Sequence, residues 1–191
     1  MTLEHSALVL VDIQNDFCPG GALAVRDGDR IIGPVNRLMA QFDMIVDCRD
    51  WHPANHRSFR SQGGPWPPHA VAGTLGAELH PNLDPSRITH HVHKADTPDR
   101  DSYSEFDGHD QHGRTLDDVL KSHHVHTLYL VGLATDYCVR ATALDGLSRG
   151  YTVCVITDAV GAVNIDPGDG DRALTEMASR GAQLISSRDV S

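Results

Sequence analysis

The sequence predicts an α/β protein with a doubly wound, mainly parallel six-stranded sheet and helices on both faces. Three observations support this fold class. Short apolar runs alternate along the chain with segments whose apolar residues recur at helical spacing. The runs are continuous rather than alternating, as expected for strands buried on both faces. The length, 191 residues, suits a single domain over residues 1–191.

The expected elements follow in order along the chain. The predicted strands are residues 6–11, 44–48, 86–93, 127–131, 151–157 and 182–186. The predicted helices are residues 29–42, 115–120, 135–149 and 171–180. Pro34 indicates that the first helix becomes regular just before that residue, and Gly181 is the expected stop of the last. Residues 53–86 are rich in Pro, Gly and His, which predicts an ordered loop that forms a site.

Composition narrows the classes of function. Sixteen basic and 26 acidic side chains give a net charge of −10, which disfavours nucleic acid or an anionic membrane as a partner. The four cysteines contain no Cys-x-x-Cys pair, which predicts reduced thiols in the cytoplasm. The first apolar run lacks a preceding basic region and ends at Asp12, so neither a signal peptide nor a membrane span is expected. No Gly-x-Gly-x-x-Gly motif or phosphate-binding loop is present, so nucleotide binding has no support.

A cysteine lies between the fourth strand and its helix. Thr135 is a candidate N-cap, and it would place Cys138 in the first helical turn, close to unpaired N–H groups and the positive end of the helix dipole. A thiol in that position is expected to have a lowered pKa and to be a good nucleophile. Because a single cysteine is more often a small buried core residue, its partners have to decide between the two interpretations.

Three strand ends each present one reactive group. Asp12 follows the first strand, Lys94 the third and Cys138 the fourth. In a parallel sheet these ends share one edge, where open α/β sheets bind their ligands. A carboxylate can take the thiol proton and later hand it to a leaving amine, while an ammonium stabilises both anions. Taken alone, Asp12 and Lys94 would more often be solvated surface charges.

A second group indicates a metal. Asp50 and His52 come directly after the second strand, and His69 lies in the irregular loop. Three such ligands suit Zn²⁺, Fe²⁺ or Mn²⁺ and leave positions open for water or substrate. We therefore expect one divalent metal ion, with Zn²⁺ favoured. His56 and Ser58 are weaker candidates for contacts around this ion.

The chain resembles the nicotinamidases (pyrazinamidases) of the isochorismatase-like cysteine hydrolase family over nearly its whole length. The matching segments are residues 11–17 (VDIQNDF) with 19–21 (PGG), 50–53 (DWHP), 64–69 (GPWPPH), the segment around Lys94, and 132–139 (GLATDYCV). The metal motif is the most specific of these, because isochorismatases proper share the fold but generally lack it.

The resemblance implies roles for particular residues. It implies a catalytic triad of Asp12, Lys94 and Cys138, and a metal held by Asp50, His52 and His69. It implies a cis peptide bond between Leu133 and Ala134, with the N–H groups of Ala134 and Cys138 forming an oxyanion hole. Phe17, Trp66 and Tyr103 would be walls of a flat aromatic pocket. The implied reaction converts nicotinamide to nicotinate and ammonia in NAD salvage, with pyrazinamide as a surrogate substrate.

Two alternatives stay open on the sequence alone. One is another amide or ether hydrolase on the same scaffold, such as an isochorismatase or an N-carbamoyl-type amidase. The other is a non-catalytic, metal-binding module in which Cys138 senses redox state. A sensor would leave Asp12 and Lys94 unexplained. The expected partner is a small molecule, and the sequence leaves a homo-oligomer open.

Overall fold

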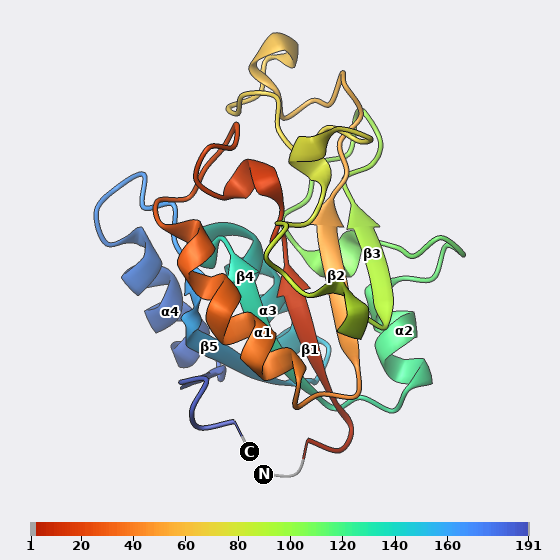
Figure 1. The fold of residues 1–191 in the computed structure, drawn as a ribbon, viewed down its shortest axis with the longest axis vertical. Coiled ribbons are helices and arrows are strands. Elements are labelled where there is room, and N and C mark those ends of the chain that lie inside the picture. The colour runs from red at the N-terminus through yellow and green to blue at the C-terminus, as the bar shows by residue number, and fades with distance from the viewer. Residues whose placement is uncertain (1–2, 191) are drawn as a thin grey trace.

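The computed structural model describes residues 3–190 and contains one six-stranded sheet (Figure 1). The strand order is β3-β2-β1-β4-β5-β6, and every neighbouring pair is parallel. The strands are β1 (Ser6–Val11), β2 (Ile45–Asp50), β3 (His90–Lys94), β4 (Thr127–Leu133), β5 (Thr152–Gly161) and β6 (Gln183–Ile185). All six residues of β1 are buried, which explains its unbroken apolar sequence.

Helices cover both faces of the sheet, so the predicted doubly wound fold is confirmed. They are α1 (Ile32–Met39), α2 (Leu116–Ser122), α3 (Arg140–Ser148) and α4 (Asp169–Ser179). α1 packs on one face, where its apolar residues join Leu8 and Leu10 of β1. α2, α3 and α4 contribute to the core on the opposite face, with Val9 and Val11 (Figure 1). Successive side chains of β1 point to opposite faces of the sheet, so this strand contributes to both hydrophobic cores.

Several element boundaries match the sequence signals. Pro34 is the third residue of α1, where its missing N–H group costs no helical hydrogen bond. Thr115 and Asp118 form a capping box at the start of α2. Gly181 follows Arg180, the C-cap of α4, and adopts a φ of +109°. Its N–H donates to the carbonyl of Ala178.

The start of α3 differs from the prediction. Residues Thr135–Val139 form a π-helical turn before α3, and Ala134, not Thr135, precedes it. The carbonyl of Ala134 accepts hydrogen bonds from Tyr137 N and Val139 N, both at 3.1 Å. The prediction that Thr135 caps the helix is therefore wrong. Such wide turns are frequent at functional sites, and this one carries Cys138.

The fifth strand is longer than predicted. The sequence places its end at residue 157, but β5 continues to Gly161. A register shift lies between Leu130 and Gly132 of β4, after which Gly132 pairs with Val160. The longer strand carries residues 160–161 to the same sheet edge as the end of β4.

Gly132 occupies a position that only glycine can fill. Its φ is +118°, and a Cβ atom there would lie 2.0 Å from the carbonyl oxygen of Val11. This close approach brings the ends of β1 and β4 together. The chain runs from β1 through β2 to β3 on one side and then returns to β4 on the other, so the topological switch point lies here. Among residues 3–190, no helix is long and apolar enough to cross a membrane.

Candidate active site

The three predicted catalytic side chains meet at the switch point. Lys94 Nζ lies 2.8 Å from each carboxylate oxygen of Asp12, and both residues are buried. Cys138 is 7% exposed, and its Sγ lies within 4.8 Å of a carboxylate oxygen of Asp12. Asp12 and Cys138 line the same cavity, whereas Lys94 does not line it and contacts Asp12 instead. The structure thus brings together a thiol, a proton acceptor and a cation.

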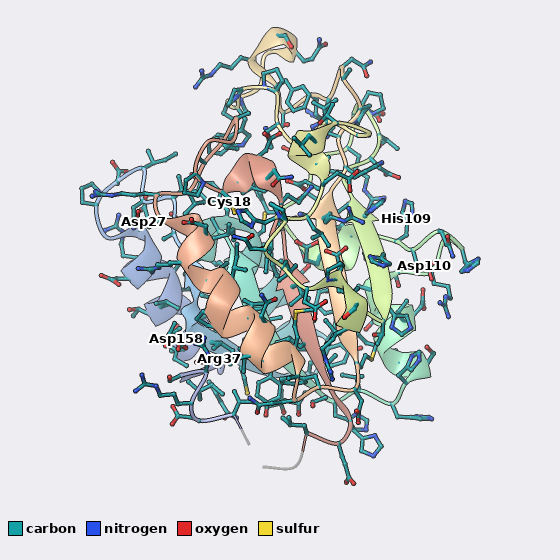
Figure 2. The ribbon with its side chains drawn as sticks, viewed as in Figure 1. Cys18, Asp27, Arg37, His109, Asp110 and Asp158 are labelled. Carbon is teal, nitrogen blue, oxygen red and sulfur yellow. The ribbon has the colours of Figure 1, made fainter. Side chains whose placement is uncertain are left out.

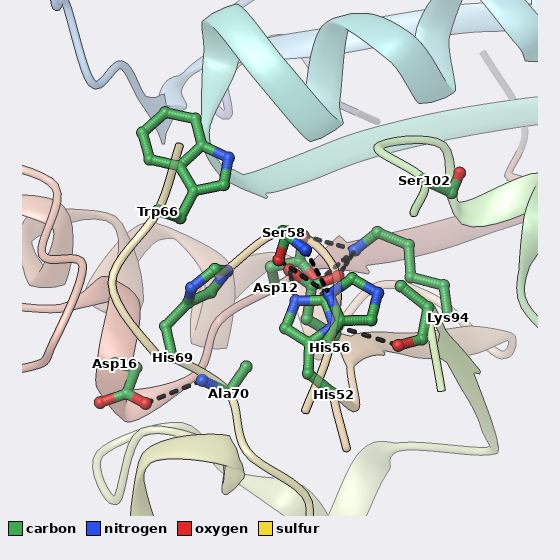
Figure 3. A network of polar contacts seen from close by, with 12 residues as sticks. Asp12, Asp16, His52, His56, Ser58, Trp66, His69, Ala70, Lys94 and Ser102 are labelled. Carbon is green, nitrogen blue, oxygen red and sulfur yellow. Dashed lines mark hydrogen bonds and ion pairs between the residues drawn. The ribbon is translucent and has the colours of Figure 1, made fainter. Parts of the chain in front are cut away.

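The Lys94 ammonium contacts more carboxylates than the sequence indicated. Besides Asp12, it lies 2.8 Å from Asp50 Oδ1 and 3.0 Å from Glu105 Oε1. Lys94 reaches Asp50 directly because β2 and β3 pair these two residues in register. One cation therefore connects the side chains around the thiol to the predicted metal ligands, and the polar network runs through the middle of the site (Figure 3).

Burial sets the proton affinities of the catalytic pair. Burial raises the pKa of Asp12 to about 6, although the Lys94 ammonium opposes this shift. Burial also raises the pKa of the Cys138 thiol well above its usual range, again against the effect of Lys94. The expectation of a lowered thiol pKa is therefore wrong: water is excluded from the sulfur, and nearby carboxylates disfavour the thiolate. A protonated thiol needs a base, and Asp12 is the adjacent one.

The three predicted metal ligands form a compact group. One ligand atom from each of Asp50, His52 and His69 lies within 4.8 Å of the others, and all three residues are buried. His52 Nδ1 lies 3.0 Å from the carbonyl of Ala95, and His69 Nδ1 lies 2.7 Å from that of Pro67.

These backbone contacts fix the tautomers of both rings. A carbonyl oxygen only accepts, so each Nδ1 carries the proton and each Nε2 keeps its lone pair for an ion. His52 Nε2 lies 3.4 Å from Asp50 Oδ2, on the side of the shared ligand group. Two imidazole nitrogens and one carboxylate are a donor set that suits a divalent metal. The residues present therefore fit the predicted ion.

The loop that carries His69 is tied to the N-terminal part of the site. Asp16 Oδ2 accepts a 2.8 Å hydrogen bond from the backbone N–H of Ala70, as Figure 3 shows. Asp16 Oδ1 accepts a second bond, from Ala22 N at 3.1 Å. Because Ala70 directly follows His69, this carboxylate fixes the position of the third ligand residue.

His56 and Ser58 are placed beside the ligands. His56 Nδ1 lies 2.7 Å from Ser58 Oγ, and His56 Nε2 lies 3.0 Å from the carbonyl of Arg100. The His56 ring also stacks on the His52 ring with centroids 4.1 Å apart. Since both ring nitrogens of His56 are engaged, its contribution is to support His52 rather than to supply a ligand atom.

Aromatic rings surround the cavity. Phe17, Trp66 and Tyr103, the residues that the resemblance implied as pocket walls, all line it. Trp66 Nε1 donates a 3.1 Å hydrogen bond to Tyr103 Oη, and the Trp66 ring packs edge-on against Tyr137 at 5.4 Å. The cavity thus has a reactive polar end and an apolar aromatic mouth, a shape suited to a flat heteroaromatic ring.

The turn after β4 completes the cavity wall. The peptide bond between Leu133 and Ala134 is cis, as predicted. Ala134 and Cys138 both line the cavity. The oxyanion role of their N–H groups stays a prediction.

Comparison with known proteins agrees with this geometry. The isochorismatase domain model matches residues 6–189, nearly the whole chain. The chain belongs to the isochorismatase family. The family expected from the sequence motifs is thereby confirmed.

Characterised relatives of this isochorismatase-family chain are similar over almost their full lengths. The nicotinamidase of Escherichia coli is 44% identical, with 96% of this chain and 95% of the relative covered. The zinc-bound pyrazinamidase of Pyrococcus horikoshii is 45% identical, with a TM-score of 0.87 and coverage of 95% and 99%. PnC1 of L. infantum, solved in complex with nicotinate, is 36% identical, with a TM-score of 0.88 and coverage of 96% and 93%.

Two buried polar residues at the site, Gln14 and Glu105, were not predicted from the sequence. Gln14 is fully buried, and its Nε2 donates to the carbonyl of Asp50 at 2.8 Å while its Oε1 accepts from Asp50 N at 3.0 Å. Gln14 thus holds the backbone of a ligand residue through both ends of one amide. The other residue is Glu105, which contacts Lys94. Gln14 follows Asp12 by two residues, and this proximity could have indicated that it belongs to the site. No sequence pattern points to Glu105.

Proposed function

We propose that this chain is a metal-dependent nicotinamidase that hydrolyses nicotinamide to nicotinate and ammonia, and that also accepts pyrazinamide. One observation carries the proposal: the thiol–carboxylate pair and the three-ligand group line a single cavity with aromatic walls. A pyridine carboxamide offers a flat ring to the aromatic walls, a ring nitrogen to the three-ligand group, and an amide carbon to the thiol. Nicotinamidases and pyrazinamidases among the relatives support the same substrate class.

The first half of the reaction forms a thioester. Asp12 removes the Cys138 proton as the sulfur attacks the carboxamide carbon, which becomes tetrahedral. The N–H groups of Ala134 and Cys138 donate to the oxyanion. When the intermediate collapses, the C–N bond breaks and Asp12 returns the proton to the nitrogen, so that ammonia leaves. Lys94 stays positively charged throughout and stabilises whichever anion is present.

The second half returns the enzyme to its starting state. Asp12 takes a proton from a water molecule, whose oxygen attacks the thioester carbon. The C–S bond then breaks, Cys138 recovers a proton from Asp12, and nicotinate is released. A carboxylate whose pKa lies near neutrality suits both directions of proton transfer.

Asp50, His52 and His69 would hold one divalent metal ion, with zinc favoured. When bound, the ion supplies a Lewis acid that orients the ring through its nitrogen and withdraws electron density from it. Trp66 and Phe17 confine the ring between them and limit the access of water. The described cysteines are all free thiols, which fits the cytoplasmic role in NAD salvage that we propose.

One measurement tests function and metal together. We expect purified protein to release ammonia from nicotinamide and to contain about one equivalent of metal in the same sample. His52→Ala should lose both, because it removes an Nε2 ligand. The control His112→Ala, at an exposed histidine outside the ligand group, should lose neither. Active, metal-free wild-type protein would instead favour another amide or ether hydrolase.

The pH dependence of kcat/KM should report the pKa of Asp12. The base works only when ionised, and burial moves its pKa upward from about 4 to about 6. Activity is therefore expected to be on its plateau above pH 7 and to fall roughly tenfold per pH unit well below pH 6. Initial rates at low substrate concentration from pH 4.5 to 8 measure this profile. A flat profile down to pH 4.5 would contradict the assignment of Asp12 as the base.

A further inference from the structure

The Asp16 carboxylate joins two walls of the cavity, although Asp16 itself does not line the cavity. Its Oδ2 accepts a hydrogen bond from Ala70 N at 2.8 Å, and its Oδ1 accepts one from Ala22 N at 3.1 Å (Figure 3 shows the first). Ala70 directly follows the ligand residue His69, whereas Ala22 belongs to a loop close to the N-terminus. One side chain therefore connects two loops that are distant in the sequence.

Residues 16–25, the N-terminal loop, form the first of these walls. Phe17, Leu23 and Val25 of this loop line the cavity. Backbone hydrogen bonds close the loop on itself, because Leu23 N donates to Asp16 O at 2.9 Å and Val25 N donates to Phe17 O at 3.0 Å. A fixed Asp16 side chain therefore fixes the position of the whole N-terminal loop.

The second wall carries both histidine ligands, and Ala70 connects them. Its N–H donates to Asp16, and its carbonyl accepts a hydrogen bond from His52 N at 2.9 Å. Ala70 is fully buried and adopts a φ of +45°, a left-handed conformation that is unfavourable for alanine. Such a conformation persists only where the surrounding groups hold it. Without the bond to Asp16, Ala70 is free to relax, and His69 moves with it.

A glycine makes the space that the Asp16 carboxylate occupies. A Cβ atom at Gly76 would lie 2.1 Å from Asp16 Oδ2 and 2.4 Å from its Cγ. A methyl group at residue 76 therefore has to displace the carboxylate. Gly76 lies in the 3₁₀ turn Leu75–Ala77 and does not line the cavity. Its φ lies outside the left-handed range, so an alanine there changes the space without straining the backbone.

We propose that Asp16 is a positioning residue that couples the metal site to the substrate pocket: one carboxylate holds His69 and the N-terminal loop in a fixed relative position. The proposal rests on the proposed function, which supplies the ion and the substrate ring. The two walls already touch, because the Phe17 ring packs edge-on against the His69 ring with centroids 5.6 Å apart. Metal affinity and the fit of the substrate ring thus depend on the same two hydrogen bonds.

Asp16→Asn tests this coupling with almost no change in volume. An amide accepts hydrogen bonds at one end only, so its NH₂ group would face one of the two backbone N–H groups. The affinity for Zn²⁺, measured by competition with a chelating dye, should fall between about 10- and 100-fold, as for other contacts that support metal ligands. At saturating Zn²⁺, KM for nicotinamide should rise by a larger factor than kcat falls, because Asp12 and Cys138 lie outside both loops.

Gly76→Ala displaces the same carboxylate without changing its chemistry. This variant should lose Zn²⁺ affinity in the same direction as Asp16→Asn, although residue 76 touches neither ligand nor substrate. The visible absorption spectrum of Co²⁺ bound in place of Zn²⁺ reports the arrangement of the ligands directly. Both variants should alter this spectrum relative to the wild type. If Asp16→Asn does not fold, Gly76→Ala decides the same question.

Asp110→Asn is the matched control for the loss of a carboxylate that holds a loop. Asp110 lies on a loop beside the β3 edge of the sheet (Figure 2). Its Oδ1 accepts hydrogen bonds from His112 N at 2.8 Å and Arg114 N at 2.9 Å. Residues 107–115 contribute neither a metal ligand nor a cavity residue. Zn²⁺ affinity, the Co²⁺ spectrum and KM should therefore be unchanged in this variant.

The outcomes distinguish this proposal from the proposed function. Wild-type protein that releases no ammonia or binds no Zn²⁺ would overturn the function itself. With an active, zinc-binding wild type, unchanged Zn²⁺ affinity in Asp16→Asn would overturn only the positioning role. A lower affinity with unchanged KM would overturn the coupling to the substrate pocket. An equal loss of affinity in Asp110→Asn would show a general loss of stability and would likewise contradict the role of Asp16.

Discussion

Cys138→Ala protein is expected to release no measurable ammonia from nicotinamide, with kcat at least about 10⁴-fold below that of the wild type. The substitution removes the only atom that can form the thioester, and no other thiol lines the cavity formed by the described residues. Cys138→Ser should fail as well, because a hydroxyl group is a much weaker acid than a thiol, and Asp12, with a pKa of about 6, is too weak a base to deprotonate it.

The metal provides an internal control for this loss. Cys138 is not one of the three grouped ligands, so elemental analysis should find the same metal content in both Cys138 variants as in the wild type. Cys154→Ala is the matched control, because Cys154 is buried in β5 outside the cavity. It should retain activity. Turnover near the wild-type rate in Cys138→Ala would exclude a thioester mechanism.

The parts of the site that could be predicted are those joined to strand ends. Continuous apolar runs identify β1 and β2, whereas β3 contains a single apolar residue, Val92. Asp12, Asp50 and Lys94 stand at or directly after the ends of these three strands. Parallel pairing then requires these residues to share one edge of the sheet. The catalytic and metal-binding groups could thus be placed near one another before any contact was known.

The remainder depends on contacts between distant segments. Glu105 enters from a 3₁₀ turn anchored on α3, and nothing in its local sequence indicates that anchor. The pKa of Cys138 was predicted in the wrong direction because local helix geometry suggests a stabilised thiolate, whereas burial depends on how the whole sheet edge is covered. The start of α3 was misplaced for a similar reason: Asp136 accepts hydrogen bonds from Val163 and Asn164, far along the chain.

Lys94→Met should destabilise the folded protein by about 3–5 kcal/mol and abolish activity, because it leaves buried carboxylates without their cation. Lys94 is fully buried, and its ammonium contacts Asp12, Asp50 and Glu105. Lys121→Met is the matched control. Lys121 pairs with Asp117 on the surface of α2, with its side chain 66% exposed, and a surface pair of this kind contributes less than about 1 kcal/mol.

The pH dependence of this destabilisation distinguishes lost charge from lost packing. In the wild type, neighbouring carboxylates raise the pKa of Lys94 well above its usual range although burial opposes them, so the lysine is charged throughout pH 5–8. Without it, the carboxyl groups have folded-state pKa values raised above those of the unfolded chain. Folding then binds protons, and stability falls as pH rises. Denaturant unfolding of chelator-treated protein should therefore show a larger difference from the wild type at pH 8 than at pH 5; an equal difference at both would mean that Lys94 stabilises the fold by packing alone.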